Sequence, residues 1–154
     1  STPTERDRQF DALMKRSLDA IGIRLEVHKD RFAELIKLNK QCRLMLQSSS
    51  WIADYPDGDN FMQLLYGPNT GQSNSACYRS PRFDRLYEKS KTMPDGPARD
   101  KLYHDMARLM EVDTAWVLAD SRYRNVLLQP HVIGYRNHPV LSAEWLYFDF
   151  ERKN

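Results

Sequence analysis

The chain has 154 residues, 41% of them hydrophobic and 29% charged, which is typical of one globular domain and excludes a disordered or fibrous chain. Its 23 Lys and Arg and 21 Asp and Glu are interspersed and leave a net charge of +2. The composition therefore does not indicate a surface that binds nucleic acid or an anionic membrane. No apolar run approaches the roughly 18 to 20 residues that crossing a bilayer requires. Cys42 and Cys77 are too few for a Cys-rich metal site or a disulfide framework. One disulfide and two buried, unlinked thiols both remain open.

The first third of the chain alternates helical and strand patterns. Its opening apolar residues share one helical stripe that ends at Gly22, namely Phe10, Leu13, Met14, Leu18 and Ile21. Residues 23–27 then alternate apolar and polar side chains, as a half-buried strand does. Asp30 is placed to cap a second helix, and residues 43–47 predict a second strand. Two strands joined by a helix are most simply parallel neighbours with a right-handed crossover, so we predict an α/β fold in which helices flank a sheet.

An irregular segment, residues 48–60, follows the second predicted strand and is rich in turn-forming residues. In an open parallel sheet, the loop that leaves the carboxyl end of a strand is the usual place for a ligand. Residues 61–65 predict one short helical face, with Asp59 as its cap. Residues 67–76 hold Gly, Pro, Asn and Ser and predict a surface loop.

Proline at the first helical position marks two helices in the second half of the chain. Ser80-Pro81 opens one with Phe83, Leu86 and Tyr87 on its buried stripe. Pro97 opens the next, whose apolar side consists of Leu102, Met106, Leu109 and Met110. After Asp113 the composition changes and predicts strands at residues 115–119, 125–128 and 145–150. Residues 131–142 contain glycine and proline and predict a connection between the last two.

The acidic loop residues Asp54, Asp57 and Asp59 raise the question of a calcium loop, which requires oxygen ligands at positions 1, 3 and 5 and a glutamate at position 12. Pro56 stands at position 3 and Leu65 at position 12, so we expect no calcium. Four histidines are scattered over four elements without the close spacing of a zinc site, namely His28, His104, His131 and His138. The sequence therefore predicts no metal and no cofactor.

Three loop hydroxyls, Ser48 to Ser50, are not bracketed by glycines as in a nucleophile elbow, so the residues do not support an enzyme. Binding chemistry fits better. Asp54 lies beside Trp51 and Tyr55, and a carboxylate near aromatic faces is suited to hold an ammonium group. On residue types alone, an equally plain interpretation is that Asp54 caps a turn and Trp51 fills the core.

Three segments of the sequence, taken together, carry more information than the single residues above. They are residues 51–61 (Trp-Ile-Ala-Asp-Tyr-Pro-Asp-Gly-Asp-Asn-Phe), residues 78–86 (Tyr-Arg-Ser-Pro-Arg-Phe-Asp-Arg-Leu), and Arg99, Leu102 and Tyr103. In this order they resemble the carboxyl-terminal part of the family 5 extracellular solute-binding proteins, the dipeptide- and oligopeptide-binding components of ABC importers. The opening, with Asp19 to Ile23 before Leu25-Glu26-Val27, is also similar, so the resemblance covers nearly all of the chain.

The resemblance implies one lobe of a type II periplasmic-binding-protein-like fold, because family members are several times longer and close two lobes on a ligand. Residues 1–121 would be most of the second, carboxyl-terminal lobe, and residues 122–154 the tail that returns to the first. The chain begins at Ser1 without methionine or a signal segment, so we expect a fragment of a protein at the periplasmic or extracellular face of a bacterial membrane. Its partners would be the missing amino-terminal lobe, the ligand and a membrane permease.

The resemblance also implies a binding site. In peptide-binding members the aspartate of the Trp-x-x-Asp block receives the amino terminus of the peptide, and Asp54 has that place behind Trp51. Some oligopeptide-binding relatives carry an arginine six residues earlier to meet the peptide's carboxylate, whereas this chain has Ser48. Since other members bind nickel chelates, sugars or other small solutes, the expected ligand is a peptide or a related small solute. The expected site consists of Asp54, Trp51, Ser48, Ser50 and Tyr55.

Two further expectations stay open. The alternative function is a free-standing interaction domain or small hydrolase that uses Ser48 to Ser50 and Asp54. The tail is apolar at residues 126–128 and 145–148, and without a first lobe it would fold back over its own lobe or pair with a second copy. The second outcome would give a homodimer that exchanges its tails.

Overall fold

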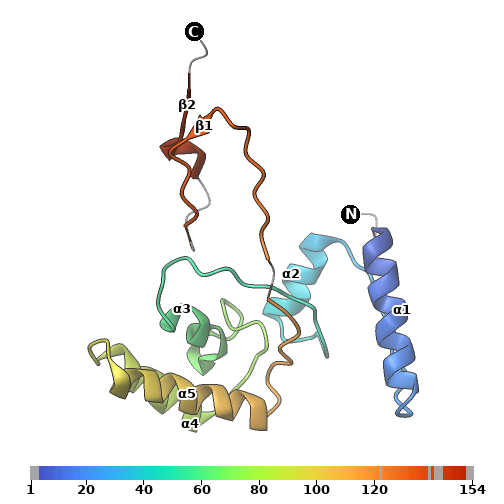
Figure 1. Cartoon of the computed structure of the whole chain (residues 1–154). Helices are drawn as coiled ribbons and strands as arrows, with labels where there is room; N and C mark the ends of the chain where they lie inside the picture. Colours follow the sequence, from blue (N-terminus) through green and yellow to red (C-terminus); the bar gives the residue numbers. More distant parts are fainter. Residues whose placement is uncertain (1–3, 122, 139, 141–143, 152–154) are drawn as a thin grey trace. The chain divides into compact units, whose positions relative to one another are not determined.

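The structure is a computed structural model that describes residues 4–121, 123–138, 140 and 144–151 (Figure 1). Contacts divide the chain into two compact units, Ser1–Leu44 and Met45–Asn154. The candidate site lies within the second unit. Neither Cys42 nor Cys77 is a free thiol, so the interpretation of two unlinked thiols is wrong.

The first unit contains two helices, α1 (Glu5–Asp19) and α2 (Phe32–Lys40). α1 begins with a capping box, in which Thr4 Oγ1 accepts the N–H of Asp7 and the Asp7 carboxylate accepts the N–H of Thr4. Gly22 follows the end of α1 with φ of 80°, which confirms the predicted helix and its stop. Arg31 occupies the N-cap of α2, and no side chain caps it. The predicted Asp30 cap is therefore wrong.

The core of the second unit lies between α4 (Pro81–Lys91) and α5 (Pro97–Val112), which pack side by side (Figure 1). Two short 3-10 helices, η1 (Gln63–Leu65) and η2 (Gly67–Asn69), precede them, and α3 (Asp59–Met62) leads into η1. The buried cluster draws on η1, α4 and α5 and consists of Leu65, Phe83, Tyr87, Met106 and Met110. Because α3 also contacts α4, the loop before α3 is attached to this core.

Both predicted proline-opened helices form where local rules place them. Ser80 Oγ accepts the N–H of Phe83 at 3.4 Å, and Pro81 is the first residue of α4. Gly96 precedes Pro97 with φ of 146°, a conformation that favours glycine. Asp59 differs from its prediction, because α3 has Gly58 at its N-cap and no side-chain cap. The Asp59 carboxylate is engaged elsewhere, as described below.

The described residues contain one sheet, in which β1 (Val132–Ile133) pairs antiparallel with β2 (Asp149–Phe150). The strands predicted at 23–27, 43–47, 115–119 and 125–128 do not form. At 145–150 only the last two residues are strand, because Glu144–Tyr147 is a 3-10 helix, η3. A strand requires a neighbour that accepts and donates its backbone hydrogen bonds, and apolar alternation supplies no neighbour. The described chain is therefore helix-rich and lacks the predicted parallel sheet.

Candidate functional site

The loop before α3 is organised around the side chain of Asn60, which is fully buried. Its Oδ1 accepts the indole N–H of Trp51 at 2.7 Å and the backbone N–H of Asp54 at 3.1 Å. Its Nδ2 donates to Asp54 Oδ2 at 3.4 Å. One amide thus binds both residues that the sequence selects as the centre of the site.

Trp51 and Asp54 are held by this amide but remain open to solvent. The Trp51 side chain is 44% exposed, and Asp54 is also exposed. Trp51 therefore does not fill the core, and Asp54 is not a buried cap. A carboxylate in this position keeps acceptor capacity for a ligand, since each ionised carboxyl group has about four lone-pair sites.

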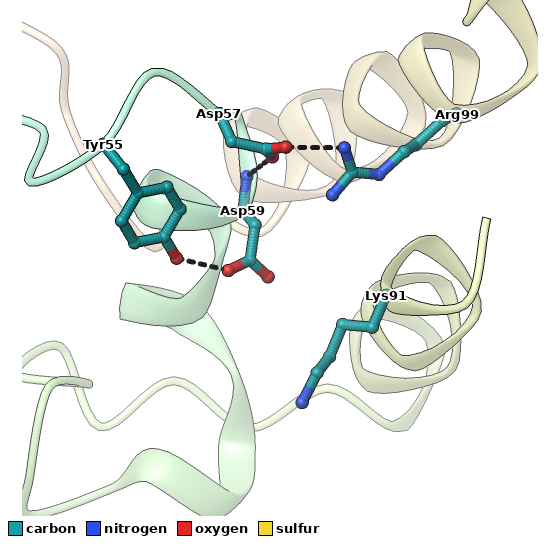
Figure 2. Close-up of a pocket in the computed structure, with 5 residues that line it drawn as sticks. All are labelled: Tyr55, Asp57, Asp59, Lys91 and Arg99. Carbon is teal, nitrogen blue, oxygen red and sulfur yellow. Dashed lines mark hydrogen bonds and ion pairs between the residues drawn. The ribbon is translucent and has the colours of Figure 1, made fainter. Parts of the chain in front are cut away.

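A hollow of about 270 Å³ lies beside the loop, where the end of α4 and the start of α5 approach it (Figure 2). Two carboxylates, two cations and one phenol line it, namely Tyr55, Asp57, Asp59, Lys91 and Arg99. Figure 2 shows Tyr55 directed at Asp59 and Asp57 directed at Arg99. Asp54 and Trp51 do not belong to this lining.

Asp57 attaches the loop to the first turns of α5. It accepts from Arg99 Nη1 at 2.6 Å, from the Tyr103 hydroxyl at 2.9 Å and from the backbone N–H of Asp59 at 2.7 Å. Burial opposes ionisation of Asp57, but these hydrogen bonds outweigh burial and hold its pKa below the usual value. Burial and the bond to Asp57 raise the pKa of Tyr103 to about 12.

Arg99 is fixed from a second direction, because its Nε donates to the carbonyl of Ser90 at 3.0 Å. Gly58 lets the loop approach α5 closely. A Cβ there would lie 2.9 Å from the Tyr103 ring, well inside van der Waals contact. The ion pair and this close approach together fix the course of the loop between Asp54 and Asn60.

Asp59 accepts the Tyr55 hydroxyl on Oδ2 at 2.5 Å. This bond is the largest contribution to a raised pKa of Tyr55. Asp59 Oδ1 is buried and has no hydrogen-bond partner among the described atoms. The nearby Tyr87 also has a raised pKa, chiefly through burial. Most polar groups around the hollow are therefore already engaged with one another.

The structure brings together some of the predicted site residues and leaves others apart. Trp51 and Asp54 meet at Asn60, whereas Tyr55 turns its hydroxyl toward Asp59. Ser48 and Ser50 are exposed, and neither hydroxyl is hydrogen-bonded to a described carboxylate or histidine. Sequence reasoning missed the role of Asn60, which looked like one more turn residue.

Within the described part of the chain, no three His, Cys, Asp or Glu side chains come together as metal ligands. None of the helices described has the length and apolar character of a membrane-spanning segment.

Known proteins similar to this chain were found by sequence comparison, although no family model matches it. It is 27% identical over 135 residues to di/tripeptide-binding protein 2 of Pseudomonas aeruginosa, covering 86% of this chain and 25% of that protein. The chain is a distant homologue of bacterial binding proteins. It is also 24% identical over 122 residues to the periplasmic oligopeptide-binding protein OppA of Salmonella typhimurium, covering 79% and 22% of the two chains.

A relative whose name gives a different ligand is heme-binding protein A of Haemophilus influenzae, 28% identical over 120 residues and covering 77% of this chain and 22% of that protein. The chain spans about a quarter of the length of the curated relatives it matches. The names of these relatives describe binding, not catalysis.

Proposed function

We propose that this chain is the carboxyl-terminal lobe of a solute-binding protein that serves an ABC transporter, with a peptide or a related small solute as ligand and no catalytic activity. Residues 1–121 would form the lobe and residues 122–154 the tail toward a first lobe. The observation that carries the proposal is the exposed pair Trp51 and Asp54, held in one place by a buried amide. The distant similarity to peptide-binding proteins supports it.

In the proposed site, the Asp54 carboxylate accepts hydrogen bonds from a ligand ammonium group. Such charge-assisted bonds are about twice as strong as neutral ones. The exposed face of Trp51 offers an apolar and cation-attracting surface beside that carboxylate. Ser48 and Ser50, which are exposed on the same loop, supply hydroxyls for polar groups farther along the ligand. Tyr55 contributes its ring edge, since its hydroxyl is bonded to Asp59.

The proposal extends to partners and location. A protein about four times as long as this chain would supply the opposing lobe, as the coverage of the relatives suggests. That protein would work at the periplasmic or extracellular face of a bacterial membrane and deliver its ligand to a permease there. Two lobes are needed because small-molecule sites usually enclose about 70 to 90% of the ligand surface.

The proposal is tested by calorimetry on the full-length protein that contains this chain, with trialanine and N-acetyltrialanine as probes. We expect trialanine to bind and N-acetylation to weaken binding at least about tenfold, because the acetyl group removes the ammonium that Asp54 receives. Equal binding of both peptides, or binding of neither, contradicts the proposal. Turnover of p-nitrophenyl acetate that is lost in the Ser48→Ala or Ser50→Ala variant would instead support the hydrolase alternative.

A further inference from the structure

Asn60 is fully buried within the second unit. Its side chain has no exposure to solvent. It bonds to Trp51 and twice to Asp54, and it also interacts with the Tyr55 hydroxyl. We infer that Asn60 is a positioning residue, which sets the orientation of Trp51 and of the Asp54 carboxylate for a ligand that it does not touch. This inference rests on the function proposed above.

Asn60 is itself fixed by the fold. Its backbone N–H donates to the carbonyl of Asp57 at 3.2 Å, and its carbonyl accepts from Gln63 Nε2 at 3.5 Å. It is the second residue of α3, which packs against α4. By contrast, residues 48–53 have no regular secondary structure. This amide therefore connects Trp51 and Asp54 to the core, and the Asp57–Arg99 contact holds the next part of the loop.

The chemistry of the three contacts matches a primary amide. Two donors, the indole N–H of Trp51 and the backbone N–H of Asp54, converge on one oxygen, and a carbonyl oxygen has two lone pairs to receive them. The amide nitrogen then donates to Asp54 Oδ2. An aspartate at position 60 would set a second negative charge against Asp54, and an alkyl side chain would take away the acceptor of both N–H donors.

The first part of the test needs no ligand and measures the indole N–H of Trp51 by NMR in the full-length protein. The signal is assigned through the Trp51→Phe variant. In the native protein we expect this proton to be shifted downfield and protected from exchange with water. In the nearly isosteric Asn60→Leu variant, and in Asn60→Ala, it should exchange about two- to tenfold faster, the range expected from losing one net hydrogen bond.

Trp116, which packs against the core cluster, is the control for folding, since a local change at Asn60 should leave its indole signal in place. An unprotected Trp51 indole in the native protein overturns the inference without any variant. If Asn60→Leu and Asn60→Ala both move the indole signals of Trp51 and Trp116 to the positions of an unfolded chain, Asn60 is a folding residue and the positioning role is wrong.

The second part of the test measures trialanine affinity in a cycle of native protein, Asp54→Ala, Asn60→Leu and the double variant. We expect each single change to weaken binding about tenfold or more, and Asn60→Leu to have a smaller effect once Asp54 is absent, because part of its action passes through that carboxylate and the rest through Trp51. An equal loss from Asn60→Leu with and without Asp54 overturns the inference. If Asp54→Ala itself leaves affinity unchanged, the proposed function fails, and a protected Trp51 indole then shows that the amide contact exists without a ligand role.

Discussion

Arg99 Nη1 lies 2.6 Å from Asp57 Oδ2 and 2.5 Å from Asp95 Oδ1, so one guanidinium nitrogen contacts two carboxylates at nearly equal distance. The surroundings of the two pairs differ. The side chain of Asp57 is 27% exposed and that of Asp95 is 90% exposed, while Arg99 is 12% exposed. Water competes for Asp95 far more than for Asp57, so the two contacts should contribute unequally to stability.

We predict that Asp57→Asn lowers the free energy of unfolding by roughly 1.5 to 3 kcal/mol, the range for hydrogen bonds to charged groups. The variant removes the less exposed of the two carboxylates that contact Arg99. Asp95→Asn is the matched control and should change stability by less than about 1 kcal/mol, as is usual for exposed ion pairs. Urea denaturation of the three proteins measures both values. Equal losses in the two variants would contradict the role assigned to Asp57.

The lowered pKa of Asp57 predicts an acid-dependent loss of stability. A carboxyl group whose pKa is depressed by folding contributes stability that is complete above its unfolded pKa of about 3.9 and is lost as pH falls through the folded value. The difference in unfolding free energy between native protein and Asp57→Asn should therefore shrink between about pH 5 and pH 2. Urea midpoints across that range test this. A difference that is constant with pH would show that ionised Asp57 is not preferred by the fold.

The isolated chain of residues 1–154 should bind trialanine weakly or not at all. A single lobe supplies one wall of a cleft, and ligand desolvation stays incomplete without the opposing wall. Calorimetry on the isolated chain and on the full-length protein, under the same conditions, makes the comparison. Micromolar binding by the isolated chain would refute the division of the site between two lobes.

The sequence predicts the helices of this chain well because their signals are local. Ser80-Pro81 and Gly96-Pro97 mark the starts of two helices, and each signal consists of two adjacent residues. Strands depend on a partner that lies elsewhere, and residues 23–27 carry the alternating pattern without such a partner among the described residues. Their pattern alone therefore could not decide whether a strand forms.

The same distinction applies to the site. Residue type makes Asp54 and Trp51 candidates and leaves a purely structural role equally open, and the resemblance at residues 51–61 is what selects them. Asn60 cannot be selected from residue type, because asparagine is common in turns and its contacts span six and nine positions. Arg99 likewise bonds to Asp57 across 42 positions. Only the fold brings these partners together.

The tail should recruit a second copy when no first lobe covers it. Tyr123 and Leu127 are 96% and 98% exposed, and Leu146 and Tyr147 are 60% and 71% exposed, although Trp145 has no described side chain. Exposed apolar groups beside a short open-edged sheet favour association. Light scattering of the isolated chain with and without residues 122–154 should give a dimer and a monomer. A monomeric intact chain would contradict the exchange of tails.

The measurement that tests the account most directly is the affinity of the full-length protein for trialanine with and without the Asp54 carboxylate. Calorimetry on the native protein and the Asp54→Ala variant gives the difference in binding free energy. We predict a loss of roughly 1.5 to 3 kcal/mol, because the variant removes charge-assisted hydrogen bonds to the ligand ammonium group. Unchanged affinity in a folded Asp54→Ala protein would contradict the assignment of this loop as the ligand-binding site.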